Sequence, residues 1–222
     1  MEFDKIFNIS RSVFYKFDDY GRIQIRGRFI EEIKIEEYPD IICCILSGFK
    51  HKNLNEIVHL FPNLVTLYME KTSQLLSLDG LHKLSSLKKI EIEKCPKLKD
   101  VSALEFCINL EKFYSTKFEN NIKLLSFLSK NSIVDLRING QVSDLDEIYK
   151  FTNLNHLLLE GFDCSRESLP TLPKLKEGLS LWGFPNLKDA SFLNNLDSST
   201  AIGWSSGPKT ITNIPEHITI EF

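Results

Sequence analysis

The side chains most able to carry chemistry in this sequence are its histidines, because an imidazole can transfer protons near neutral pH or ligate a metal. They are His51, His59, His82, His156 and His217. Their spacing matches no catalytic pattern, since no HExxH or CxxC pair occurs. His156 is expected near Asp135, but a lone surface histidine is far more often solvated than catalytic. The sequence predicts no catalytic residue, and an enzyme is the third choice of function.

The segment from Gly203 to Thr210, GWSSGPKT, has the glycines and the lysine of a phosphate-binding loop. Its details do not fit that chemistry. Pro208 stands between the second glycine and Lys209, and the interval between the glycines is one residue short. No helical pattern follows to supply an N-terminus for phosphate. We therefore expect a turn here, and we expect neither a cofactor nor a metal site.

Composition narrows the possible partners. The formal charge of −3 and the absence of a Lys/Arg run argue against nucleic acid. The first ten residues, MEFDKIFNIS, contain acidic residues and no apolar signal core, and no apolar run approaches a membrane span. The five cysteines show no paired spacing, so we interpret them as reduced core thiols. They are Cys43, Cys44, Cys95, Cys107 and Cys164. Together these features predict a cytoplasmic protein that does not bind membranes.

Apolar residues recur with one rule along most of the chain. Leu87, Ile90 and Ile92 have the spacing LxxLxL, whose last three positions alternate as in a half-buried strand. The same triplet returns in steps of 23, 23, 23, 23 and 21 residues. The triplets are Ile41-Cys44-Leu46, Leu64-Leu67-Met69, Leu87-Ile90-Ile92, Leu110-Phe113-Ser115, Ile133-Leu136-Ile138 and Leu154-Leu157-Leu159. A repeat of this length predicts a solenoid whose coils stack to form a continuous parallel sheet.

The two ends of the chain depart from this rule. We assign residues 1–40 to an N-terminal cap, 41–204 to the repeats and 205–222 to a C-terminal cap with a terminal strand through Ile218 and Ile220. Alternation over residues 13–17 favours a capping hairpin, while Tyr20, Ile23 and Ile25 fit a first repeat, and both can hold. Residues 29–38 are ambiguous between helix and strand. Between later strands, residues 144–151 have helical spacing.

These residues resemble the leucine-rich repeat family, specifically the short-repeat bacterial type found in internalins. The strongest support is LKKIEIEKCPKLKDVSAL and its echo LSLWGFPNLKDASFL. The resemblance implies an α/β leucine-rich repeat solenoid with a concave parallel β-sheet, a convex side of short helices and 3-10 turns, and caps at both ends. The family normally places Asn or Cys after the strand, and only Cys95 matches, so these bends must be satisfied differently. Ser115 in a core column is a second departure.

Function on such a scaffold is expected on the concave face, at the outward positions of the strands. The candidate partner-binding residues are Tyr68, Glu70, Glu91, Glu93, Tyr114, Arg137, Leu158, Glu160 and Trp182. Aromatics and arginine are the residue types that anchor interfaces, although tyrosine and tryptophan also suit strands that bind nothing. The glutamates favour a basic partner, and Lys88, Lys89 and Lys112 at the edge weaken that preference.

The sequence thus predicts a non-catalytic module that recognises a specific protein and is a monomer when unbound. The leading hypothesis within that class is an intracellular inhibitor, such as an immunity protein that neutralises a bacterial toxin. The alternative is an adaptor or scaffold that recruits a protein without inhibiting it.

Overall fold

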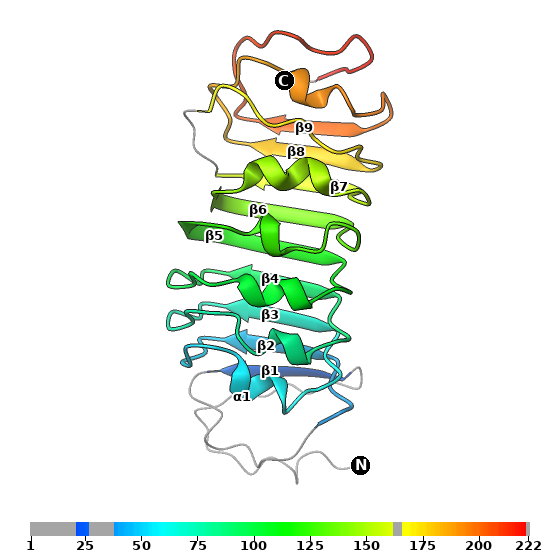
Figure 1. Ribbon diagram of the computed structural model, residues 1–222. Helices are drawn as coiled ribbons and strands as arrows, with labels where there is room; N and C mark the ends of the chain where they lie inside the picture. Colours follow the sequence, from blue (N-terminus) through cyan, green and yellow to red (C-terminus); the bar gives the residue numbers. More distant parts are fainter. Residues whose placement is uncertain (1–20, 27–37, 162–165, 221–222) are drawn as a thin grey trace.

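A computed structural model describes residues 21–26, 38–161 and 166–220. Within these ranges, nine strands form one parallel sheet in which each strand pairs with the next along the chain (Figure 1). The strands are β1 (Arg22–Arg26), β2 (Cys43–Ser47), β3 (Thr66–Glu70), β4 (Lys89–Glu93), β5 (Lys112–Ile122), β6 (Asp135–Val142), β7 (His156–Glu160), β8 (Gly178–Trp182) and β9 (Ala201–Ser205). The order and the parallel pairing confirm the predicted solenoid with its continuous parallel sheet.

The register of the strands reproduces the apolar triplets of the sequence. Leu67 of β3 pairs with Ile90 of β4, and Phe113 of β5 pairs with Leu136 of β6. These side chains are fully buried, while the residues on either side of them in each strand are partly exposed. Because successive side chains of a strand point to opposite faces, one face of the sheet is buried and the other is open. The predicted repeat register is confirmed.

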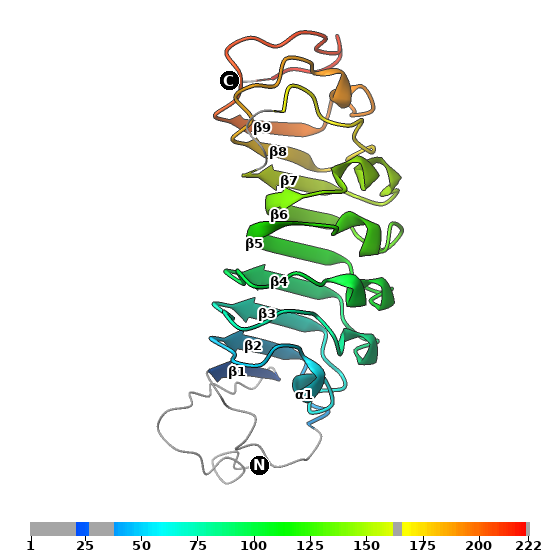
Figure 2. The same cartoon turned by 60° about the vertical axis from the view of Figure 1, so that its left-hand side comes forward.

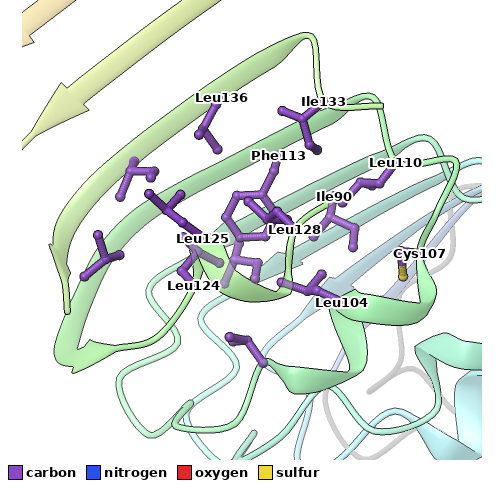
Figure 3. Packing of buried hydrophobic residues seen from close by; sticks show 14 of the residues in the cluster. Ile90, Leu104, Cys107, Leu110, Phe113, Leu124, Leu125, Leu128, Ile133 and Leu136 are labelled. Atoms are coloured by element: carbon purple, nitrogen blue, oxygen red, sulfur yellow. The ribbon is translucent and has the colours of Figure 1, made fainter. Parts of the chain in front are cut away.

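The return segments cover the buried face of the sheet with short helical turns (Figure 2). They include the α-helix α1 (Asn55–Val58) and the 3-10 helices η3 (Leu81–Lys83), η4 (Ser102–Phe106), η5 (Leu125–Phe127), η6 (Leu145–Lys150) and η7 (Ser191–Leu193). The helical spacing predicted over residues 144–151 corresponds to η6. In Figure 3, Leu125 and Leu128 of one return segment lie close to Phe113 of the sheet. The core is therefore a single apolar layer between the sheet and the return path.

The aspartate of the Lys-Asp-x-Ser sequence, which occurs at residues 99–102 and again at 188–191, has the same structural role in both places. Asp100 Oδ1 accepts the backbone N–H of Ser102 at 2.9 Å, and Asp189 Oδ1 accepts that of Ser191 at 2.8 Å. Each carboxylate thus satisfies a backbone donor at the start of a 3-10 helix. The pKa of Asp100 lies below its usual value because the Ser102 hydroxyl, at 2.7 Å, and the Ser102 N–H both donate to it. The pKa of Asp189 is lowered by the Ser191 N–H and by the Asn213 amide.

Asparagine occurs at the bend before the strand instead of the bend after it. Four asparagine side chains donate to a carbonyl of the preceding coil: Asn63 to Pro39 at 3.1 Å, Asn109 to Ser85 at 2.9 Å, Asn153 to Asn131 at 2.7 Å and Asn195 to Leu172 at 3.1 Å. After the strand, Thr72 Oγ1 and Cys95 Sγ lie 2.7 Å apart. The bends of these two coils are therefore joined by a side-chain contact between Thr72 and Cys95 in place of an asparagine ladder.

The core column that contains Ser115 is interrupted at β5. Ser115 is 3% exposed, and its hydroxyl donates to the Arg137 carbonyl at 3.5 Å. The pairing of β5 with β6 shifts register just beyond it, between Ser115 and Phe118 and again before Ile122. The serine side chain fills this core column less completely than the leucine, isoleucine or methionine of other coils. The regular hydrogen-bond ladder between β5 and β6 ends at the same position.

The two ends of the solenoid test the predictions for the two caps. β1 pairs in parallel with β2, so Ile23 and Ile25 belong to a first repeat unit. The hairpin predicted over residues 13–17 and the ambiguous stretch 29–37 lie outside the described residues. At the other end, residues 206–220 contain one isolated bridge, at Thr212, and no strand.

The predicted terminal strand is therefore not found in the described part of the C-terminal cap. Ile218 uses its own N–H to close a turn onto the Pro215 carbonyl at 2.9 Å, so that donor is not available to a strand ladder. Ile218 is nonetheless buried and covers the last coil. The glycine-rich segment also differs in part from the expected turn, because its first three residues, 203–205, belong to β9.

Candidate protein-binding face of the sheet

The open face of the sheet collects every candidate binding residue that the sequence predicts. In the middle column, Gln24, Ile45, Tyr68, Glu91, Tyr114, Arg137, Leu158, Ser180 and Gly203 are successive register partners. A second column, nearer the carboxyl ends of the strands, runs Ser47, Glu70, Glu93, Thr116 and, beyond the irregular part of β5, Asn139, Glu160, Trp182 and Ser205. We call this surface, which carries no helices, the sheet face.

Lys89 links the two tyrosines of the middle column. Its Nζ donates to the Tyr68 hydroxyl at 3.0 Å and lies 3.1 Å from the Glu91 carboxylate. It also lies 4.7 Å from the ring centroid of Tyr68 and 4.6 Å from that of Tyr114. Burial lowers the pKa of Lys89, but the hydrogen bonds to Tyr68 and Glu91 outweigh it, so the net pKa is above the usual value. A permanent cation is thus held between two aromatic rings.

Asp135 organises the adjacent part of the sheet face. Its carboxylate accepts the Tyr114 hydroxyl at 2.6 Å and the Arg137 guanidinium at 3.1 and 3.0 Å. His156 Nδ1 lies 3.1 Å from the same carboxylate, which confirms the proximity expected from the sequence. The Arg137 guanidinium in turn lies 4.4 Å from the Tyr114 ring centroid. Four side chains from β5, β6 and β7 therefore form one connected cluster.

These contacts shift the pKa values of the Asp135 cluster in the directions that keep it intact. Burial raises the pKa of Asp135, but hydrogen bonds from Arg137, Tyr114 and His156 outweigh burial and bring the net pKa below the usual value. Burial and the hydrogen bond to Asp135 raise the pKa of Tyr114, so its hydroxyl stays protonated and remains a donor. Asp135 was absent from the predicted binding residues, because a carboxylate at the start of a strand carries no local signal of three cross-strand partners.

Three of the four candidate glutamates already have polar partners on the protein. Glu70 accepts the Ser47 hydroxyl at 2.5 Å, Glu91 pairs with Lys89 at 3.1 Å, and Glu93 pairs with Lys94 at 2.8 Å. Glu70, Glu91 and Glu93 also line a shallow open pocket with Ile45, Tyr68 and Met69. Internal pairing reduces the attraction that these carboxylates exert on a basic partner. Among the four, only the Glu160 side chain has no hydrogen bond or ion pair with any described residue.

The part of the sheet face on β7, β8 and β9 is less polar. Trp182 is 48% exposed, and Leu158 is partly exposed in the neighbouring strand. The outward residues around them on β8 and β9 are small: Gly178, Ser180, Ala201, Gly203 and Ser205. The described outward residues of β8 and β9 therefore carry no long side chain beside the indole, and much of the Trp182 ring is within reach of a partner.

The part of the chain that the structure describes offers no metal site. Within the described ranges, no group of three or more His, Cys, Asp and Glu side chains is arranged to hold a metal ion. The same ranges contain no helix with the length and apolar character required to cross a bilayer. Four of the five cysteines are buried and form no disulfide, namely Cys43, Cys44, Cys95 and Cys107, while Cys164 lies outside the described residues.

Comparisons with known proteins found a likeness only among solved structures. No protein-family model matches the chain, and no curated protein sequence does. An internalin C2 from Listeria monocytogenes matches with a TM-score of 0.39 and 18% identity, covering 75% of this chain and 62% of its own. An internalin from the same species, inlF, matches with a TM-score of 0.39 and 15% identity, covering 84% and 74%. This chain thus spans less than two thirds of the length of the internalin C2 structure.

Proposed function

We propose that this leucine-rich repeat solenoid is a non-catalytic module that binds a specific protein through the sheet face. The observation that carries the proposal is Trp182, an indole 48% exposed at the end of β8, where the outward residues of β8 and β9 beside it are small. Burying an exposed tryptophan releases water from a large apolar area, which is why tryptophan is enriched among residues that dominate interfaces. Arg137, stacked on Tyr114 with part of its guanidinium free, adds a second group of the same kind.

The size of the face supports a protein partner. Strands stack about 4.8 Å apart, so Tyr68 on β3 and Trp182 on β8 lie roughly 24 Å from each other. That span suits a standard protein interface and exceeds a small-molecule pocket. The face is also held in shape by side-chain contacts between strands, chiefly the Asp135 cluster. A preformed surface loses little conformational entropy on binding.

Within this class, we propose an intracellular inhibitor, such as an immunity protein that neutralises a bacterial toxin. An inhibitor must hold its target for long times, and a preformed face favours slow dissociation. The buried thiols, which form no disulfide, fit a reducing compartment and therefore a cytoplasmic location. The second candidate is an adaptor that recruits its partner and leaves the partner's activity unchanged. In both cases the unbound protein is proposed to be a monomer.

The test uses affinity capture with the wild-type protein and two matched variants. Trp182→Ala removes the exposed indole of the sheet face, and Phe106→Ala removes a ring of η4 that is 57% exposed on the helical side. A partner that binds the wild type and Phe106→Ala but not Trp182→Ala supports the proposal. A partner lost only with Phe106→Ala contradicts it.

An activity assay of the captured partner separates the two finer hypotheses. Inhibition on adding the purified protein supports the inhibitor, and unchanged activity supports the adaptor. Turnover of a substrate by the protein alone would contradict both.

A further inference from the structure

Glu160 and Trp182 form a side-by-side pair at the carboxyl ends of β7 and β8. They are register partners, so their backbones are about 4.8 Å apart and their side chains leave the same face of the sheet. Trp182 is 48% exposed. No described residue gives the Glu160 side chain a hydrogen bond or ion pair, and no described cation lies over the Trp182 ring. A carboxylate and an aromatic ring therefore stand together without a cation.

The same face shows what such groups do when a cation is within reach. Around Lys89, two aromatic rings and one carboxylate hold an ammonium: Nζ lies 4.7 and 4.6 Å from the ring centroids of Tyr68 and Tyr114 and 3.1 Å from Glu91. Ring and carboxylate act together, because the ring face and the carboxylate both present negative potential to the cation. Lys89 is an internal example of the ligand that this combination accepts.

At Glu160 and Trp182 the chain does not supply the lysine. Lys89 comes from the outward column at the amino ends of the strands, and that column continues through His156 to Gly178 on β8 and Ala201 on β9. Neither glycine nor alanine can reach toward the indole.

We propose that Glu160 and Trp182 form a recognition site for an arginine side chain of the protein partner. The proposal rests on the proposed function, and it assigns the chemistry of one contact within that interface. A guanidinium is planar and weakly hydrated, so it can stack on the indole while it donates to the Glu160 carboxylate. Charge complementarity selects a cation here, because Glu160 is the one candidate glutamate that no described cation or hydroxyl already satisfies.

The experiment uses a short capped peptide with two arginines and its twin in which citrulline replaces both. Citrulline keeps the planar shape and removes the charge. The protein contains two tryptophans, and Trp204 is only 8% exposed, so the two indole N–H signals in a nitrogen–proton correlation spectrum report an exposed and a buried ring. The Trp182→Leu variant assigns the Trp182 signal.

We expect the arginine peptide to move the Trp182 indole signal and leave that of Trp204 in place, with little effect from the citrulline peptide. Glu160→Gln should weaken binding of the arginine peptide by about two- to fivefold, and salt should weaken it as well. Glu93→Gln is the matched control, because Glu93 lies in the same column but already pairs with Lys94. It should leave the affinity unchanged.

Three results would overturn the inference: an unmoved Trp182 signal, equal shifts with both peptides, or equal affinity in Glu160→Gln and wild type. If the arginine peptide instead shifts signals around Glu70 and Glu93, the inference fails while the sheet face survives as a binding surface. If the captured partner still binds Trp182→Ala and is lost with Phe106→Ala, the proposed function fails with it.

Discussion

Tyr114 donates its hydroxyl proton to Asp135 at 2.6 Å, across the ladder that joins β5 to β6. The bond ties an aromatic ring predicted to touch a partner to a carboxylate that the sequence did not single out. Because Lys89 and Arg137 also lie over that ring, Tyr114 is more a structural part of the sheet face than a free anchor. This relationship changes which substitutions are expected to affect stability and which are expected to affect binding.

The first prediction separates the two faces of one strand. Leu157 is fully buried, whereas Leu158, the next residue of β7, points to the sheet face and is partly exposed. Leu157→Ala should lower the free energy of unfolding by roughly 2 to 5 kcal/mol, because it leaves a cavity in the core. Leu158→Ala should cost less than about 1 kcal/mol. Denaturant unfolding measures both, and equal losses would show that the assigned register is wrong.

The second prediction concerns pH and Asp135. Its pKa is lower in the folded protein than in the unfolded chain, so the carboxylate stabilises the fold above the unfolded value of about 4. That contribution disappears as the pH falls through the folded pKa. The stability difference between wild type and Asp135→Asn should therefore be largest near neutral pH and shrink below about pH 4.

Thermal unfolding across this pH range measures the Asp135 effect. Asp146→Asn, which changes an exposed carboxylate of η6, is the control and should lie close to wild type throughout. A difference that stays constant down to the lowest pH would mean that ionisation of Asp135 does not stabilise the fold.

The third prediction concerns the asparagines before the strands. Asn109→Ala removes the hydrogen bond to the Ser85 carbonyl and should cost about 0.5 to 1 kcal/mol. Ser86 occupies the same position one coil earlier and is exposed, so Ser86→Ala should be nearly neutral. Chemical denaturation of both variants tests the assignment, which does not hold if Asn109→Ala unfolds at the wild-type midpoint.

The fourth prediction concerns thiol reactivity. Burial raises the pKa of Cys107 to about 12 and raises that of Cys44 well above its usual value, so neither forms the reactive thiolate at neutral pH. In a Cys164→Ser protein, labelling of these two thiols by a disulfide reagent should proceed only as fast as the protein opens. Mass spectrometry of labelled peptides locates the reaction. Rapid labelling of Cys107 in the native protein would contradict its place in the core.

The fifth prediction ranks the aromatic residues in binding. Trp182→Ala should weaken partner binding by about 2 kcal/mol or more and leave folding nearly intact, because the indole makes few internal contacts. Tyr114→Ala should lower the thermal midpoint as well, because it removes the hydrogen bond to Asp135 and the surface on which Arg137 stacks. Surface-plasmon kinetics with the captured partner and circular dichroism separate the two effects. A larger binding loss for Tyr114→Ala with unchanged stability would reverse the ranking.

The fold was readable from the sequence because it depends on a periodic pattern. Leu87, Ile90 and Ile92 recur with a fixed step, and each coil can bury that apolar edge only against its neighbours. The register, the parallel order and the short helical turns follow from this repetition. The terminal strand predicted through Ile218 was wrong in the described residues, because alternation does not show where backbone donors go, and the Ile218 N–H closes a turn onto the Pro215 carbonyl.

The sequence by itself determined which residues face solvent on the sheet, since alternation along a strand places Tyr68, Glu91 and Trp182 on one side without further information. Only the tertiary structure decided which of those residues are available. Contacts between coils join side chains about 20 residues apart, as in Tyr114 with Asp135 and Asp135 with His156. No local pattern encodes such contacts, because they depend on rotamers and on the distance between stacked strands. For that physical reason, Lys89 is already held by two tyrosines while Glu160 and Trp182 are left open.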